Sequence, residues 1–350
     1  MQNNTNFAQQ INKAQYKAMQ KDPFMICMGL GIDDPKSIFG TTKGLAKDFG
    51  SERVFDIPTS ENAMTGIGIG AAIAGTRVLM THQRVDFFLL AMDQLVNNAA
   101  KWHYMFNGLM TVPLTIRLII GRGWGQGPTH QQSLQSWFAH IPGLKVVVPS
   151  LTDNVGQLLY QSLMDNNPTI FLEHRWLHNQ QCLKSECNDF EDSFSTVRQH
   201  SEGEDITIIT NSYLTLETLR AVKELKQHGI SADVFETHHL HDIDWNMICN
   251  SIKKTGRCLI TDIGHGNYSV SSEIAYQVSE REFSSLIKAP RRIALPNYPE
   301  PTSFGLTKDY YITASKIINT VLELMDRPAC EFKSLIEKHD VPGDWFKGPF

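Results

Sequence analysis

A single glutamate stands where the sequence changes from a strand-like run to a series of very small residues. The stretch Ser60–Gly75 reads SENAMTGIGIGAAIAG and follows RVFDIPT, so Glu61 comes just after an apolar segment and a turn at Pro58. Side chains this small fill little space, so another part of the protein must pack close to this backbone. A glutamate at the start of such a helix loses water, which favours its protonated form and suits a proton-transfer group. We therefore predict that Glu61 is catalytic.

The glycine-rich loop Gly121–His130, GRGWGQGPTH, carries the second set of candidates. It follows the apolar run VPLTIRLII and precedes a predicted helix, which places it at the carboxyl end of a strand, where α/β proteins bind ligands. It lacks the GK[ST] ending of a phosphate-binding P-loop. Trp124 and His130 are unusual in a loop without a function. Histidine can exchange protons near neutral pH. A flexible surface loop is the alternative interpretation.

A polar turn between a predicted strand and a predicted helix forms the third group. It contains His82, Arg84 and Asp86, followed by Phe87. These groups form either a solvated polar cluster or a site where the arginine binds a carboxylate or phosphate. An aromatic residue at the spacing of Phe87 is typical of a helix packed on a core.

Composition limits the kind of protein this can be. The chain has 350 residues, of which 41% are hydrophobic and 20% charged, which is enough for two domains with buried cores. The net charge of −5 and the absence of a Lys/Arg run argue against a nucleic-acid-binding surface. No segment is apolar for long enough to cross a membrane, and the polar N-terminus has no signal-peptide core. Six scattered cysteines without a CxxC pair predict reduced thiols in a cytoplasmic protein.

Strands and helices alternate along the chain in two series, and most strands are continuous apolar runs. This pattern predicts an α/β protein with two doubly wound domains, each with a mostly parallel sheet covered on both faces. We expect the first domain at residues 1–178 and the second, smaller one at 204–326. Residues 179–203 are polar with little periodicity and are predicted to be a linker, and residues 327–350 form a C-terminal extension.

Several segments together are similar to those of one known family. They are RVFDIPTSE ending at Glu61, AMDQLVNNAAK in the helix that begins near Phe87, HQQS starting at His130, FAHIPGLKVVVP ending at Pro149, and DNNP at 165–168. On these segments the chain resembles the β subunits of the thiamine-diphosphate-dependent 2-oxoacid dehydrogenases of the pyruvate, branched-chain and acetoin types. The resemblance covers nearly the whole chain and is more specific in the first domain.

The resemblance implies a pyrimidine-binding domain followed by a transketolase-like C-terminal domain. In that family a glutamate, matched by Glu61, hydrogen-bonds the ring nitrogen of the aminopyrimidine and favours the imino tautomer that activates the cofactor. The aromatic residue that stacks on the pyrimidine matches Phe87, and the active-site histidine matches His130. The remaining candidates, on the substrate side, are His82, Arg84 and Trp124.

The resemblance also implies metal ions and a partner chain. The family's potassium-type structural site matches Leu163, Asp165 and Asn167, mostly through backbone oxygens. Thiamine enzymes hold the diphosphate through magnesium with a GDG motif, yet the one Gly-Asp pair of this sequence is Gly343-Asp344. We therefore expect an α subunit to carry the diphosphate and magnesium site, in an α2β2 assembly.

Three functions stay open on the sequence. The leading hypothesis is the β subunit of a 2-oxoacid-decarboxylating dehydrogenase, whose C-terminal domain in this family also docks a lipoyl acyltransferase. The second is a split transketolase-like or carboligating enzyme that passes its acyl or aldehyde unit to a small acceptor. Three features favour this second function: Thr81-His82, where the family has Glu-Phe or Glu-Ile, the loop Arg122–Gln126, and the C-terminal extension, which could alter or block the docking. The third is a non-catalytic partner that stabilises an α chain.

Overall fold

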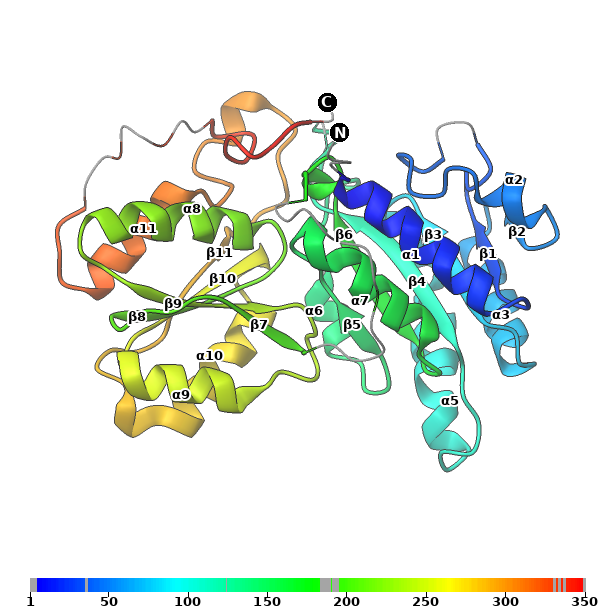
Figure 1. Cartoon of the computed structure of the whole chain (residues 1–350), viewed down its shortest axis with the longest axis horizontal. Helices are drawn as coiled ribbons and strands as arrows, with labels where there is room; N and C mark the ends of the chain where they lie inside the picture. The colour runs from blue at the N-terminus through cyan, green and yellow to red at the C-terminus, as the bar shows by residue number, and fades with distance from the viewer. Residues whose placement is uncertain are drawn as a thin grey trace. The chain divides into compact units, whose positions relative to one another are not determined.

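The computed structural model describes residues 5–34, 37–123, 125–182, 190, 195–329, 332, 335 and 338–348. The chain divides into two compact units (Figure 1). The first unit comprises Met1–Arg122 and Thr129–Phe194, and the second comprises Gly123–Pro128 and Ser195–Phe350. No helix in these described ranges is long and apolar enough to cross a membrane.

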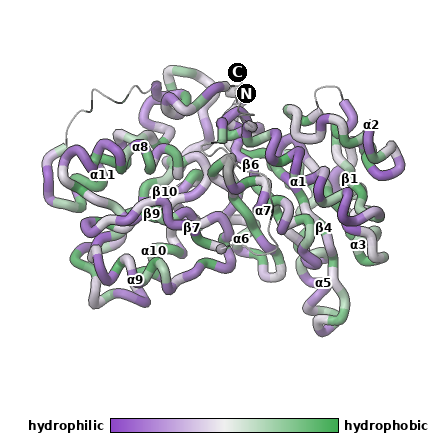
Figure 2. Tube along the Cα trace, viewed as in Figure 1, coloured by the Kyte–Doolittle hydropathy of each residue, from purple (hydrophilic) through white to green (hydrophobic). Residues whose placement is uncertain are grey.

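The first unit is built on a parallel sheet of six strands in the order β2-β1-β3-β4-β6-β5. The strands are β1 Ile26–Gly29, β2 Val54–Asp56, β3 Val78–His82, β4 Leu114–Ile120, β5 Lys145–Val147 and β6 Thr169–His174. Every residue of β3, β4 and β6 is buried, as expected for strands covered on both faces. Figure 2 shows stretches of hydrophobic residues along these central strands.

Helices cover the sheet of the first unit on both faces. They are α1 Phe7–Lys21, α2 Leu45–Phe49, α3 Glu61–Ile73, α4 Val85–Phe88, α5 Ala100–Met105, α6 Gln135–Ala139 and α7 Thr152–Met164, with a 3-10 turn η3 at Arg175–Leu177. The helix α1 begins with a capping box, in which the side chains of Asn6 and Gln9 each bond the other's backbone N–H. It packs along α7, and Figure 1 shows the two helices side by side.

The helix predicted to begin near Phe87 is not continuous. It is divided into α4, a 3-10 turn η1 at Leu89–Ala91, a π-helical segment η2 at Gln94–Ala99, and α5. Apolar spacing reports which face is buried and does not distinguish α-helical from 3-10 or π hydrogen bonding, so the prediction was wrong about continuity. Segments of π-helix are frequent at functional sites, and this one packs against α3.

The second unit has a sheet of five strands in the order β11-β10-β8-β9-β7. Its strands are β7 Val197–Ser201, β8 Ile206–Thr210, β9 Ala232–Thr237, β10 Cys258–His265 and β11 Arg291–Leu295. Its helices are α8 Leu214–Gln227, α9 Trp245–Thr255, α10 Val270–Glu282 and α11 Ala314–Leu324, with 3-10 turns η4 Phe283–Ser285 and η5 Phe304–Leu306. All strands are parallel except β7, which pairs antiparallel with β9 at one edge. The predicted α/β class with two mostly parallel sheets is confirmed.

Two features of the second half differ from the sequence prediction. The strands β7 and β11 lie in stretches where no strand was predicted, and both are partly exposed edge strands whose polar residues hide the usual pattern.

Cys182 forms a disulfide, so the prediction of reduced thiols is wrong at this position. A disulfide needs two cysteines close in space, and their scatter in sequence does not exclude that.

The described part of the C-terminal extension packs on the second unit through a buried glutamate of α8. One oxygen of Glu217 accepts hydrogen bonds from Trp345 Nε1 at 2.6 Å and Gly343 N at 3.0 Å. Its other oxygen accepts from Ala314 N at 2.9 Å and Arg220 at 2.8 Å, and Arg220 also contacts Asp344 at 3.0 Å. Burial raises the pKa of Glu217, and these donors oppose the shift. The extension therefore supplies partners that the buried carboxylate needs.

Replacing Trp345 by phenylalanine should weaken this attachment. The change removes the indole N–H donor and leaves the buried carboxylate with one partner fewer, which costs about 1.5–3 kcal/mol of unfolding free energy. Urea unfolding of the full chain measures the loss. The matched control is Lys347→Ala, which removes an exposed side chain whose one hydrogen bond among the described residues goes to the carbonyl of Asp344. An unfolding midpoint for W345F equal to that of K347A would contradict the assignment.

Candidate functional site

Glu61 is the first residue of α3 and directly follows the connection that leads from the end of β2 to this helix. Its side chain is 7% exposed, and Ser60 precedes it as the N-cap residue. Within the part of the chain that the structure describes, no hydrogen bond or ion pair joins its carboxyl group to another residue. The residue is thus mostly buried at a helix start, where N–H groups lack intrahelical acceptors, and its carboxyl group is available to a ligand.

The small residues after Glu61 bring α3 close to its neighbours, as the sequence predicted, but only in part. A side chain at Gly68 would touch Met28, Val78 and Met80, at 3.4–3.7 Å from its Cβ. One at Gly66 would meet Gln94 of η2 at 3.3 Å. At Gly70, and at Gly75 beyond the helix end, nothing lies within 4 Å of the position that a Cβ would take, so the predicted close approach is wrong at these two glycines.

Phe87 and His130 are brought together although they lie far apart in the sequence. Phe87 lies in α4, and its ring meets the ring of His130 edge to face, with centroids 5.3 Å apart and planes at 86°. Nδ1 of His130 also contacts the hydroxyl of Thr129 at 2.9 Å. Both rings are partly exposed. The structure therefore pairs an aromatic surface with a group that can exchange protons.

Two loop segments that follow neighbouring strands are tied together and hold this pair in place. Nη1 of Arg84 donates to the carbonyl of Gly121 at 2.9 Å, and Gly121 N donates to the carbonyl of Gln132 at 3.2 Å. The side-chain amide of Gln132 in turn donates to Asp86 at 2.8 Å. Asp86 is next to Phe87 in sequence, and Gln132 is two residues after His130. The bond between Asp86 and Gln132 therefore helps to fix the spacing between the two rings. Sequence reasoning missed Gln132, although it lies within the HQQS segment.

Gly121 is required at its position for two separate reasons. Its φ of +73° is favourable only for glycine, and a Cβ there would lie 2.0 Å from Nε2 of His174. The ring of His174 therefore packs directly on the backbone where β4 ends. Burial lowers the pKa of His174 to about 3, and the nearby charges of Arg84 and His178 contribute to that shift. His174 is thus a neutral packing group and not a proton donor.

His82 and Arg84 lie deeper than the sequence suggested. His82 is 1% exposed, packs edge-on against Phe88 at 5.0 Å, and has no hydrogen-bond partner on either ring nitrogen among the described residues. Burial lowers the pKa of His82 to about 4, so the ring is neutral near pH 7. Arg84 is 4% exposed, and burial lowers the pKa of its guanidinium while Asp86 opposes that shift. Neither residue is the solvated surface group of the alternative interpretation.

Comparison with known proteins gives the family. Residues 4–180 match the model of the transketolase pyrimidine-binding domain, and residues 195–317 match that of the transketolase C-terminal domain. The β subunit of acetoin:2,6-dichlorophenolindophenol oxidoreductase from Bacillus subtilis is 33% identical over 333 residues, which cover 91% of this chain and 96% of the relative. The chain belongs to the transketolase-like family of 2-oxoacid dehydrogenase β subunits.

Other members of this family are comparably similar. The mitochondrial pyruvate dehydrogenase E1 component subunit beta-1 of Arabidopsis thaliana is 33% identical over 85% of this chain and 83% of its own length. The 2-oxoisovalerate dehydrogenase subunit beta of Bacillus subtilis is 31% identical over 90% of this chain and 97% of its own. A solved structure described as a split gene transketolase, inactive beta4 tetramer, has a TM-score of 0.73 at 20% identity, covers 92% of this chain and 99% of its own, and shows the shared fold.

The residues of this family member fit the pyrimidine half of thiamine diphosphate. Glu61 is mostly buried and its carboxyl has no partner in the described ranges, and the ring of Phe87 is partly exposed beside His130. Within those ranges no hydrogen bond or ion pair joins Glu61 to His130. Trp124, the remaining substrate-side candidate, lies outside the described residues.

The residues predicted for potassium do not fit that ion. The carbonyl oxygens of Leu163 and Asp165 accept hydrogen bonds from the guanidinium of Arg77, at 2.9 and 2.5 Å. Asn167 instead donates its backbone N–H to the Asp165 carboxylate at 2.8 Å. Among the residues that the structure describes, no group of His, Cys, Asp and Glu could hold a metal ion either.

Proposed function

We propose that this chain is the β subunit of a thiamine-diphosphate-dependent 2-oxoacid-decarboxylating dehydrogenase and supplies the pyrimidine half of its cofactor site. The observation that carries the proposal is Glu61, a mostly buried residue at the start of the helix α3 whose carboxyl has no partner among the described residues. Family membership supports the cofactor class, since the curated relatives are named as β subunits of 2-oxoacid dehydrogenases.

Each site residue has a proposed role. Glu61 hydrogen-bonds the ring nitrogen of the aminopyrimidine and, in its protonated form, donates to it, because that nitrogen carries no hydrogen of its own. Phe87 stacks on the ring, and His130 exchanges protons with the substrate. When bound, thiamine diphosphate supplies a nucleophilic carbon and an electron sink for decarboxylation. His82 and Arg84 support the substrate side from their buried positions.

The diphosphate half is proposed to come from an α subunit in an α2β2 assembly. Asp344 belongs to the one Gly-Asp pair of the sequence, and its carboxylate pairs with Arg220 in the second unit. That Gly-Asp pair is thus part of the C-terminal attachment and is not free to hold magnesium. We therefore assign magnesium to the partner.

Calorimetry tests the division of the cofactor site. Thiamine diphosphate with magnesium should bind the isolated full chain at least roughly 100-fold more weakly than it binds the complex with the α subunit. The reason is that the diphosphate and magnesium are bound by the α subunit in this proposal. The control titration uses thiamine diphosphate with the Glu61→Gln chain in the same complex. Tight magnesium-dependent binding by this chain alone would overturn the half-site proposal.

A split transketolase-like or carboligating enzyme is the second candidate. Two observations favour it: the unpartnered ring nitrogens of His82 in the described structure, which could hold an acceptor, and the attachment of the C-terminal extension to α8. Reduction of a lipoyl domain separates the two candidates. A complex that decarboxylates an oxoacid without acylating a lipoyl domain would be the carboligating type.

Three further expectations accompany the main proposal. The functional boundaries are proposed at residues 1–178, 179–203, 204–326 and 327–350. A lipoyl acyltransferase is a candidate partner on the C-terminal domain. We also propose a cytoplasmic location, noting that the plant relatives are named as mitochondrial.

A further inference from the structure

One arginine of the first unit bonds three oxygen atoms at the end of one helix and pairs with a carboxylate at the end of another. Arg77 precedes β3, and its side chain is 17% exposed. Its Nη1 donates to the carbonyls of Leu163 and Asp165 at 2.9 and 2.5 Å, and its Nη2 donates to Oδ1 of Asn166 at 3.1 Å. Its Nε lies 3.5 Å from the carboxylate of Asp22 at the end of α1.

These oxygens need positive charge. The helix α7 ends at Met164, so the carbonyls of Leu163 and Asp165 belong to the helix end, where carbonyls lack intrahelical donors and the helix dipole is negative. The Asp165 carboxylate adds a further charge and pairs with Lys145. A cation placed here gives the carbonyl oxygens at the end of α7 a partner. Arg77, just before β3, and Lys145 of β5 thereby link α7 to these two strands.

A guanidinium fills this place with directed bonds. It presents five N–H donors in a rigid fork, and Arg77 uses this fork to reach the ends of both α1 and α7. A potassium ion would need the same two carbonyl oxygens that Nη1 already occupies, next to a fixed positive charge. Asn167 Oδ1 is buried without a partner among the described residues, but one oxygen is far short of the several that a metal cation collects.

We propose that the guanidinium of Arg77 takes the place of the potassium-type ion implied by the family resemblance. This chain then carries its own cation at the end of α7 and folds without a monovalent metal ion. The proposal does not depend on the catalytic assignment, because it concerns residues at the opposite end of the strands from Glu61. Strand β3 begins at this end, and its carboxyl end leads to Arg84 and Phe87.

The chain offers a matched control in Arg53. Its Nη2 donates to the carbonyls of Met19 and Asp22 at 2.9 Å each, and its Nε donates to Met25 O at 3.0 Å. Arg53 thus satisfies the end of α1 as Arg77 satisfies the end of α7. No metal ion is implied at the end of α1.

Thermal unfolding of the full chain in different chloride salts tests the proposal. At one ionic strength, the wild-type Tm should be the same, to about 1 °C, in potassium, sodium and tetramethylammonium chloride. A potassium site filled to about 100 times its Kd would instead raise the Tm by roughly 5–10 °C with a saturable dependence on concentration. A potassium-specific, saturable rise in the wild type would overturn the proposal.

The variants Arg77→Ala and Arg53→Ala complete the test. Both should lower the Tm by roughly 4–10 °C in tetramethylammonium chloride, because helix-end carbonyls lose charged donors. Potassium should restore part of the loss in R77A, where the vacated oxygens become a cation site, and none in R53A. An R77A chain as stable as the wild type would refute the proposal. If R77A fails to fold, Arg77→Lys keeps the charge without the fork and should give an intermediate, potassium-independent Tm.

Discussion

Replacing Glu61 by glutamine is expected to lower kcat of the assembled complex roughly 100- to 10,000-fold, the usual contribution of a positioned proton-transfer group. Glutamine keeps the shape of the side chain but has no acidic proton to transfer to the cofactor's ring nitrogen. Steady-state decarboxylation of a 2-oxoacid with an artificial electron acceptor measures the loss. This assay is independent of the lipoyl partner.

The same substitution should leave the fold nearly unchanged, which separates catalysis from stability. Glu61 has no intramolecular partner in the described structure, so only its favourable interaction with the helix start is lost, about 0.3–1 kcal/mol. Asn62→Ala, one residue further along α3 and exposed, is the matched control and should retain full activity. Wild-type turnover in E61Q would favour the third hypothesis, a non-catalytic partner.

The central sheet of the first unit could be predicted from the sequence because its strands are apolar over most of their length. The strands β3, β4 and β6 are buried on both faces, and continuous apolar runs are the pattern that such strands leave. The edge strands β7 and β11 leave no such pattern, since solvent covers part of each. Prediction from pattern therefore succeeded for the buried strands and failed for β7 and β11.

The site was predicted less completely, and for a different reason. The position of Glu61 follows from its local sequence, a small-residue helix after a strand. The meeting of Phe87 with His130 depends on β3 and β4 being neighbours, which local patterns do not show; only the family resemblance suggested a joint role for both residues. No role was predicted for Arg77. Its bonds to Leu163 and Asp165 span 86 and 88 residues of sequence, beyond the reach of any local pattern.

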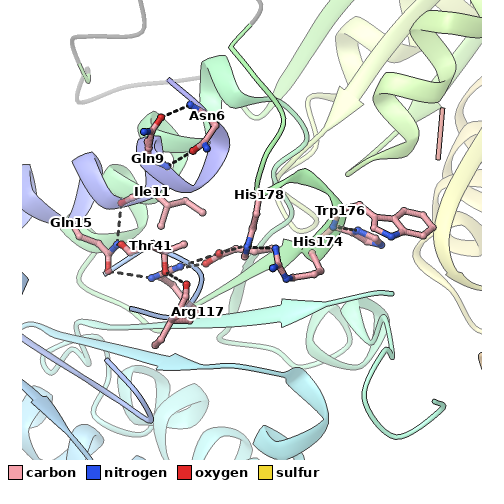
Figure 3. A network of polar contacts seen from close by, with 12 residues as sticks. Asn6, Gln9, Ile11, Gln15, Thr41, Arg117, His174, Trp176 and His178 are labelled. Carbon is pink, nitrogen blue, oxygen red and sulfur yellow. Dashed lines mark hydrogen bonds and ion pairs between the residues drawn. The ribbon is translucent and has the colours of Figure 1, made fainter. Parts of the chain in front are cut away.

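A buried ion pair in the first unit gives the largest expected effect on stability. In Figure 3, Arg117 of β4 and His178 lie on the same polar network, with Gln15 of α1. Arg117 donates to both oxygens of Glu173, at 2.5 and 3.0 Å, and to Gln15 at 3.1 Å, while Nε2 of His178 lies 3.2 Å from Glu173. All four side chains are buried. Arg117→Met should therefore cost about 3–5 kcal/mol of unfolding free energy, because it leaves an uncompensated carboxylate in the core.

The pH dependence of this loss distinguishes an unpaired charge from simple loss of packing. Burial raises the pKa of Glu173, but Arg117 and the hydrogen bond from His178 outweigh it and hold the pKa below its ordinary value. Without Arg117 the same burial should lift that pKa above the unfolded value of about 4.3, so protonation would then stabilise the folded state. The difference in unfolding free energy between R117M and the wild type should accordingly shrink as the pH falls from about 7 toward 5. The double variant Arg117→Met with Glu173→Leu, which removes both charges, should recover most of the stability and lose this pH dependence. A pH-independent deficit in R117M would show that the guanidinium acts there mainly by filling space.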